Sequence, residues 1–300
     1  MIPFVRDFDP AWGRLVRVTP RIGRVTARNP GPFTFTGTGT YLIGDAAAGA
    51  SLAVIDPGPA DNDHLAALLA AVAGRRVSHV LVTHSHRDHA ALAQAFARAV
   101  SAPVSAARPP ARTVHASGVE EGDDETFVPD RILEDGEVIT GDGWTLETLA
   151  TPGHASDHLS FALHEENALF CGDHVMGWST TVVAPPDGDM AAYMASLDKV
   201  IARRFDRLFP THGAPIEDPA PFLGAYRDHR LARDAQILAR LAAGDRRISE
   251  IVPHLYATVD ARLWPAASLS VWAHLIALVE AGRAQAGDGA TLDGVYSPVG

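Results

Sequence analysis

Four side chains that commonly bind metal ions lie within six consecutive positions of this chain: His84, His86, Asp88 and His89. Imidazole nitrogens and carboxylate oxygens are the ligands that zinc and similar divalent ions prefer. Residues 79–82 before the cluster are largely apolar and β-branched, which predicts a buried strand, and residues 90–100 after it have apolar side chains at helical spacing. The cluster is therefore expected on a strand-to-helix turn, where such side chains are explained by a bound ion.

Three further candidate ligands follow predicted strands: His154 in TPGH, Asp173 in CGDH and His212 in PTHG. On an extended turn, His84 and His86 can bind one ion from the same side. Asp88 and His89 begin the next helix and point to a neighbouring position. Two tetrahedrally coordinated ions need about eight ligand contacts, which these seven residues supply if Asp173 bridges both ions. A bridging hydroxide would then complete a two-metal site with ions roughly 3.5–4 Å apart.

The segments that must position these residues alternate between strand and helix patterns, which favours an α/β sheet with helices outside it. Strands are predicted at 37–45, 51–59, 77–83, 144–154 and 206–216, a hairpin at 158–175, and helices at 61–74, 90–100 and 190–204. Residues 14–30 alternate apolar with basic or polar side chains and predict edge strands, and residues 101–136 are less regular. Most candidate ligands thus fall where a predicted strand ends.

The character of the chain changes near Pro221, where one long amphipathic helix begins and shorter helical patterns follow. A short strand pair is expected only near 283–293, and the Gly-rich tail from 287 is expected to be irregular. We therefore predict two domains, a catalytic domain over 1–221 and a helical domain over 222–300.

Composition excludes several classes of protein. The 300 residues are 47% hydrophobic and 20% charged, as in an ordinary globular protein, and no run approaches the ~18 apolar residues of a membrane span. A net charge of -11 disfavours general nucleic-acid binding, which depends on attraction to phosphates. The N-terminus lacks the pattern of a secretory signal, and the single cysteine, Cys171, fits a reducing compartment, so we expect a cytoplasmic protein without a membrane partner.

The motif THSHRDH resembles the THxHxDH signature of the metallo-β-lactamase superfamily, and TPGHASDH, CGDH and THG resemble its later ligand motifs in the same order. The resemblance covers residues 14–216 and implies a four-layer αββα sandwich with the metals at one edge of two packed sheets. Carried over to this chain, it implies a first ion bound by His84, His86, His154 and Asp173. The second ion would be bound by Asp88, His89, Asp173 and His212.

The resemblance also implies roles beyond direct ligation. Asp56, in VIDPG, matches an aspartate that accepts a hydrogen bond from a ligand histidine and fixes its tautomer. Asp88 is expected to orient the nucleophile while it binds its ion. His158 is expected to be structural. From its position directly after Asp173, His174 is a candidate to face the substrate, and the hydroxyls of residues 179–181 either lie at the rim of the site or cap a buried loop.

Residues 29–44 and 173–197 are similar to the β-lactamase-like subfamily that includes the mitochondrial endoribonuclease, although Thr40 stands where that family commonly has Asn. That subfamily carries a winged-helix-like C-terminal domain, which residues 222–285 would suit. Glyoxalase II-like thioesterases also have a helical C-terminal domain, but their basic, tyrosine-containing pocket for the glutathione carboxylate is not recognisable in this sequence. Residues 248–282 contain one arginine, Arg262, and no lysine. Packing beside the active site, or formation of a homodimer, is therefore favoured over DNA binding.

The function expected is a dinuclear zinc-dependent hydrolase, with iron or manganese as alternative metals. A metal-bridging hydroxide would attack an ester, thioester, lactam or phosphodiester. The expected partner is a small ester, thioester or lactam, or else single-stranded RNA. The alternatives are a single-stranded RNA endonuclease and a persulfide-dioxygenase-like iron enzyme, and the latter expects a mononuclear site with fewer ligands.

Overall fold

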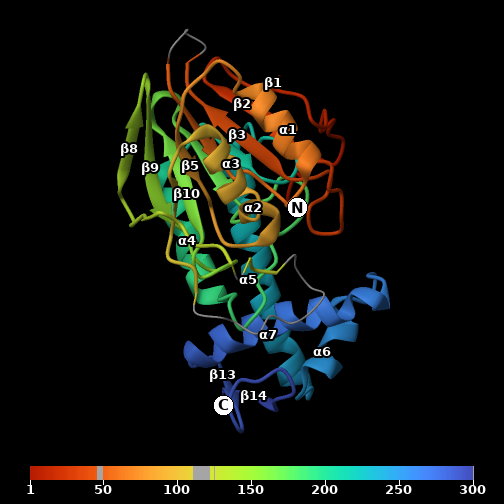
Figure 1. Cartoon of the computed structure of the whole chain (residues 1–300). Coiled ribbons are helices and arrows are strands. Elements are labelled where there is room, and N and C mark those ends of the chain that lie inside the picture. Colours follow the sequence, from red (N-terminus) through yellow and green to blue (C-terminus); the bar gives the residue numbers. More distant parts are fainter. Residues whose placement is uncertain (46–49, 111–121, 125, 300) are drawn as a thin grey trace.

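Two packed β-sheets with helices on both outer faces form the larger part of the protein, as shown in Figure 1. This computed structural model describes residues 1–45, 50–110, 122–124 and 126–299. The first sheet has the order β1-β2-β3-β4-β5-β6-β7 and the second the order β12-β11-β10-β9-β8. The strands of the first sheet are β1 (Val16–Arg17), β2 (Ile22–Thr26), β3 (Gly39–Ile43), β4 (Leu52–Ile55), β5 (Val77–Leu81), β6 (Val104–Ala106) and β7 (Arg131–Ile132). Those of the second are β8 (Val138–Gly141), β9 (Trp144–Ala150), β10 (Leu159–Leu163), β11 (Ala168–Gly172) and β12 (Arg207–Pro210).

Alternation along the strands builds three apolar layers. In β10 and β11, Phe161 and Phe170 point into the core between the sheets, while Ala162 and Leu169 point to the outer face. The outer face of the second sheet packs on α4 (Met190–Arg203) and the start of α5 (Pro219–Ala243). The first sheet packs on α1 (Asn62–Ala71) and α3 (Ala93–Val100), while the single turn α2 (Arg87–Ala90) precedes α3. This order of layers confirms the predicted αββα sandwich.

Several predicted elements differ from the structure. The helix predicted at 90–100 is divided into α2 and α3, and the less regular segment 101–136 contributes β6 and β7. Residues 111–121 of that segment lie outside the described part of the chain. The prediction of edge strands at 14–30 is wrong for β2, which lies between β1 and β3 and is buried at every position. Its basic residue Arg24 is buried, because its guanidinium donates hydrogen bonds to two backbone carbonyls of the second sheet's edge.

The C-terminal part packs around its own small core. Helices α5, α6 (Ile248–Leu255) and α7 (Trp264–Glu280) surround it, and the strands β13 (Ala284–Ala286) and β14 (Tyr296–Pro298) pair as a two-stranded ribbon. The expectation of an irregular tail holds for residues 287–295 but is wrong for Tyr296–Pro298, which form β14 with Tyr296 buried in this core. By length and hydropathy alone, residues 261–280 could cross a membrane. Leu269, Leu275 and Leu278 are nonetheless buried, as in the central helix of a folded domain.

Helix α5 belongs to both parts of the molecule. Phe222 and Tyr226 in its first half pack in the core with α4, whereas Ile237 and Leu241 in its second half pack with α6 and α7. The boundary expected at 221/222 thus falls inside one continuous helix of 25 residues.

Candidate functional site

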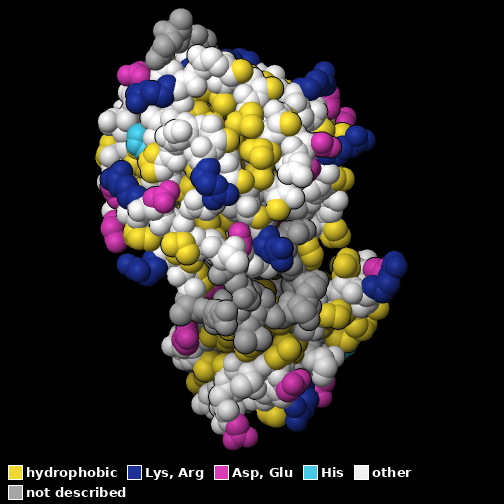
Figure 2. Space-filling view, in the orientation of Figure 1, with side chains coloured by type: hydrophobic (Ala, Val, Ile, Leu, Met, Phe, Trp, Pro, Cys, Tyr) yellow, Lys and Arg dark blue, Asp and Glu magenta, His cyan; other side chains and the backbone are white. Residues whose placement is uncertain are grey.

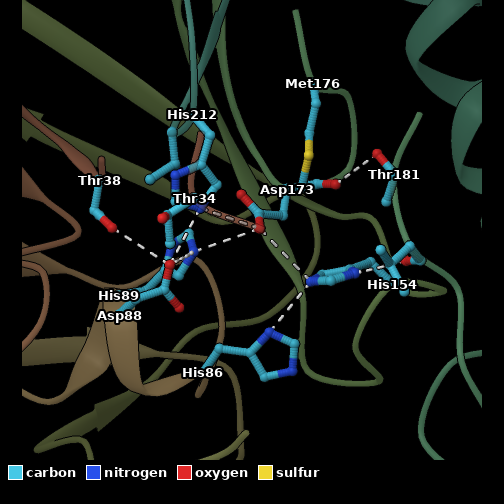
Figure 3. A network of polar contacts seen from close by, with 12 residues as sticks. Thr34, Thr38, His86, Asp88, His89, His154, Asp173, Met176, Thr181 and His212 are labelled. Carbon is cyan, nitrogen blue, oxygen red and sulfur yellow. Dashed lines mark hydrogen bonds and ion pairs between the residues drawn. The ribbon is translucent and has the colours of Figure 1, made fainter. Parts of the chain in front are cut away.

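All seven candidate ligands come together at one edge of the sandwich, beyond the carboxyl ends of the strands. His84 and His86 follow β5, and Asp88 and His89 lie in α2. The other three follow β9, β11 and β12, respectively: His154, Asp173 and His212. Each of the seven is at most 5% exposed. Figure 3 shows side chains from these separate segments converging on one centre.

One group of ligands consists of three histidines. His86 Nδ1 lies 2.9 Å from His84 Nε2 and 3.2 Å from His154 Nε2. The Nδ1 of His154 faces the Val182 carbonyl at 2.8 Å, so that nitrogen must donate and Nε2 carries a lone pair. Imidazole nitrogens gathered in this way around one point are arranged to share a cation.

A second group contains Asp88, His89 and His212. Asp88 Oδ2 lies 3.4 Å from His89 Nε2 and 3.2 Å from His212 Nε2. Asp173 Oδ2 lies 3.6 Å from His89, 3.4 Å from His212 and 3.8 Å from His154 of the first group. The carboxylate of Asp173 is therefore placed between the two groups, where a shared ligand has to be.

Two atoms of this centre lack the hydrogen bonds that buried polar atoms normally have. His89 Nε2 and Asp173 Oδ1 are buried, and neither has a hydrogen-bond partner among the described residues. The opposite nitrogen of His89 donates to Asp56 Oδ2 at 2.9 Å, so Nε2 can present a lone pair. The donor set, its burial and these two atoms fit divalent cations.

Without bound cations, the two groups of candidate ligands differ in charge. Burial and the neighbouring histidines lower the pKa of His84 well below its usual range, and burial and His154 lower the pKa of His86 to about 3. In the second group, burial opposes protonation of His212, but Asp173 and Asp88 outweigh it and raise its pKa to about 9. Burial likewise opposes ionisation of Asp88, yet His89 and His212 hold its pKa at about 2. The second group therefore holds protons that a cation has to displace.

Asp56 connects three segments of the site. At the end of β4 it has a positive φ of 51°, which Asp tolerates better than most residues. Its carboxylate accepts hydrogen bonds from the Thr83 backbone and hydroxyl at 2.7 and 2.9 Å, from Thr211 at 3.1 Å and from His89. The geometry is that expected for a residue that fixes the His89 tautomer.

Arg24 is a supporting residue that the sequence pattern did not reveal. Its guanidinium donates to the carbonyls of Gly213 at 2.6 Å and Thr211 at 3.2 Å, which flank His212 on both sides. Gly39 provides the space, since a Cβ there would lie 2.3 Å from Arg24 Nε. These contacts explain why a basic residue is buried in β2.

His158 and Thr38 hold ligands through hydrogen bonds. His158 Nε2 accepts a hydrogen bond from the backbone N–H of Asp173 at 3.1 Å, and Thr38 donates to Asp88 Oδ2 at 3.3 Å. His158 thus has the expected structural position. Thr38 had no recognisable signal, because a threonine in a predicted strand is ordinary.

Of the candidates to face the substrate, His174 is enclosed. It is 0% exposed and its ring packs on Tyr193 at 5.0 Å, so it does not line the site. Thr181 donates to the carbonyl oxygens of Asp173 and His174, and the Tyr226 hydroxyl holds the same loop through the backbone N–H of Thr181.

A cavity of about 560 Å³ opens from the ligand centre toward the C-terminal helices. His86, Asp88, His154, Asp173 and His212 line one end of it. The loop 176–182 forms a side wall. Residues of α5, α6, α7 and the segment 256–263 between α6 and α7 form the far wall, including Leu255, Tyr256, Val259, Leu263 and Ala267. Trp178, stacked on Phe35 with ring centroids 4.7 Å apart, also lines the cavity. The volume lies within the range of small-molecule sites.

Comparison with known proteins identifies the fold and the family. A family model of the metallo-beta-lactamase superfamily matches residues 34–212, and a model of the beta-lactamase associated winged helix domain matches residues 248–291. A beta-lactamase domain protein from Burkholderia ambifaria superposes with a TM-score of 0.78 at 21% identity, covering 99% of this chain and 97% of that one. A metallo-beta-lactamase family protein from Thermus thermophilus gives 0.74 at 23% identity, covering 94% of this chain and 100% of that one.

Relatives with closer sequences are known. An atrochrysone carboxyl ACP thioesterase from Aspergillus chevalieri is 33% identical, over 81% of this chain and 75% of that protein. A beta-lactamase-like protein 2 homolog from Caenorhabditis elegans is 31% identical, over 74% of this chain and 71% of that protein. The chain belongs to the metallo-β-lactamase superfamily and is an enzyme of its hydrolase class. It carries the winged-helix domain of the β-lactamase-like branch, as the sequence predicted. This superfamily typically binds divalent metals, which the His/Asp donor set fits.

Proposed function

We propose that this protein is a dinuclear, zinc-dependent thioester hydrolase that acts on a small acyl substrate. The observation that carries the proposal is the cavity joining the His/Asp centre to an apolar wall of the C-terminal helices. An acyl chain can lie along that wall while its carbonyl carbon lies at the centre. The similarity to an ACP thioesterase over most of the chain supports this substrate class.

The residues of the site have separate roles in this proposal. His84, His86 and His154 would hold one ion, Asp88, His89 and His212 would hold the other, and Asp173 would serve both. Two bound divalent ions supply Lewis acidity and lower the pKa of water, so that a nucleophile exists at neutral pH. Asp88 lines the cavity and its carboxylate can orient the attacking water. Asp56 and Arg24 keep the ligands in place.

RNA cleavage is the main competing activity. Nucleic-acid binding is dominated by attraction between basic side chains and phosphates, and the net charge of this chain is -11. On the face shown in Figure 2, Lys and Arg are scattered among acidic residues and do not gather into one patch. A small, largely apolar cavity favours a small substrate over a strand of RNA.

The test is a panel of thioesters, lactones, β-lactams and short single-stranded RNAs, with metal content measured on the same protein. We expect thioester turnover, about two zinc ions per chain, loss of activity on chelation and recovery with zinc. Asp173→Asn removes the shared carboxylate and should lower kcat/KM by about a thousandfold or more. Asp288→Asn, at an exposed position of the tail, serves as the control. RNA cleavage abolished by Asp173→Asn, without thioester turnover, would replace this proposal.

A further inference from the structure

The two ends of the cavity carry opposite kinds of side chain. Among the described residues that line it, the acids are Asp88 and Asp173, both at the ligand centre. Arg230 and Arg233 on α5, with His229 and His274 nearby, line the cavity outside the ligand centre, and Arg230 also contacts the loop 176–182 through the Thr181 carbonyl. Outside the ligand centre, the described lining residues therefore include two guanidinium groups and no carboxylate.

Neither arginine has a counter-charge in the part of the chain that the structure describes. Arg230 is 4% exposed; it donates to the Thr181 carbonyl, while its Nε has no hydrogen-bond partner among the described groups. Arg233 lies over the Tyr256 ring at 4.4 Å and contacts the Leu255 carbonyl at 3.5 Å. Arg233 is only partly buried. Desolvating the buried guanidinium of Arg230 without a counter-charge is costly, unless a ligand supplies the negative charge.

The carboxylate that follows Arg233 in sequence is already engaged. Asp234 lies 2.7 Å from His274 Nδ1 and 3.5 Å from Arg283. Burial lowers the pKa of His229 to about 4, and Arg230 and Arg233 act in the same direction through their positive charge. Burial also lowers the pKa of His274, and both arginines again act in the same direction. With both histidines neutral, the positive potential at this end comes from the two arginines.

We propose that Arg233, together with Arg230, binds an anionic group on the part of the substrate remote from the bond that is hydrolysed. The anionic group is a carboxylate or a phosphate, since either can accept two parallel hydrogen bonds from a planar guanidinium. The apolar wall between the two ends then contacts the chain that joins this anion to the thioester. This inference rests on the proposed thioesterase function only for the identity of the reacting bond.

The experiment first measures binding without turnover. Zinc-loaded protein is titrated by calorimetry with pantetheine and with 4′-phosphopantetheine, which differ only in the phosphate. We expect the phosphorylated ligand to bind about 10–100-fold more tightly, the size of one or two charged hydrogen bonds. Arg233→Met should remove that difference and Arg233→Lys should retain part of it. Arg227→Met, on the same helix but exposed and paired with Asp198 at 2.9 Å, should leave it unchanged.

Turnover then distinguishes a phosphate from a carboxylate as the source of the charge. Neutral acetyl and carboxylate-bearing succinyl thioesters of N-acetylcysteamine are compared, with thermal unfolding as the check on folding. If the carboxylate is the natural anion, the succinyl substrate has the lower KM, and Arg233→Met raises that KM alone. Thioester turnover without preference for either charged ligand would overturn the anion site. A charge preference in binding without any thioester turnover would instead overturn the proposed function and leave the anion site standing.

Discussion

At the scale of single residues, a hydrogen-bond acceptor on the outer side of a ligand histidine fixes the tautomer of its ring. The Val182 carbonyl receives a hydrogen bond from His154, and the Asp56 carboxylate receives one from His89. In each case the outer nitrogen donates, so the inner nitrogen presents its lone pair to the centre. Removal of the Asp56 carboxylate should therefore release the tautomer of His89 without removing a ligand.

Metal binding should weaken as the pH falls. In the metal-free protein His212 has a pKa raised to about 9, and the pKa of His89 is raised well above its usual range although burial opposes this. Both protons are therefore held at pH 7, and that of His212 is lost as the pH rises through about 9. Because a ligand nitrogen must be deprotonated, zinc affinity should rise about tenfold per pH unit for each proton released.

Competition with a chromophoric chelator between about pH 6 and 9 measures this slope, and calorimetry in buffers of different ionisation enthalpy counts the protons. His164→Gln, at a half-exposed position away from the centre, should leave the slope unchanged. A zinc affinity that is independent of pH over this interval would contradict the assignment of protons to His89 and His212.

At the scale of elements, each ligand segment follows a strand, and the two sheets must be in register for the segments to meet. Strands β2 and β3 pair so that Thr26 lies opposite Gly39, and Arg24 reaches across to the turn after β12. The support for His212 therefore comes from the opposite sheet.

Gly39→Ala should disrupt this support. The added Cβ would meet Arg24 Nε at 2.3 Å, so the guanidinium would have to leave the carbonyls of Thr211 and Gly213. Overpacking of this kind destabilises by about 1–3 kcal/mol, and we expect partial loss of the ion bound by His212 as well. Denaturant unfolding and metal analysis measure the two effects.

Gly224→Ala provides the matched control, because a Cβ there meets nothing within 4 Å and the position lies in α5. It should stabilise the protein by up to about 1 kcal/mol, since alanine favours a helix over glycine. A Gly39→Ala protein with normal stability and two ions per chain would show that Arg24 has no positioning role.

The ligand residues were predictable from sequence because each stands in a short motif at the end of a recognisable strand. Arg24 was not, since the carbonyls that satisfy it lie in a segment almost 190 positions away and alternation in β2 suggested an exposed edge. The ribbon strand β14 was missed because three residues in a Gly-rich tail show no period. Arg230 and Arg233 resemble the ordinary polar face of an amphipathic helix, and only the docking of α5 places them in a cavity.

At the scale of the whole molecule, the two domains share one cavity, so the C-terminal helices should govern substrate size. Ala266 on α7 lines the far end. Ala266→Trp would fill part of that space and should lower kcat/KM for long acyl thioesters at least about tenfold, the loss expected when an apolar chain is excluded. Acetyl thioesters should be affected less than about twofold, because they reach only the ligand centre.

Chain-length series measured with Ala266→Trp and with Ala239→Trp test this expectation. Ala239 is exposed on α5 and is absent from the cavity lining. Equal losses for short and long substrates in Ala266→Trp would mean that the C-terminal wall does not contact the acyl chain.

Helix α5 has a kinetic consequence. Its 25 residues form a rod about 37 Å long that runs without a break from the core of the sandwich into the C-terminal core. Because this rod is anchored in both cores, we expect the wall that α5 contributes to the cavity to stay in place through the catalytic cycle. With no lid to open, product release should not limit turnover, and solvent viscosity should have no effect on kcat.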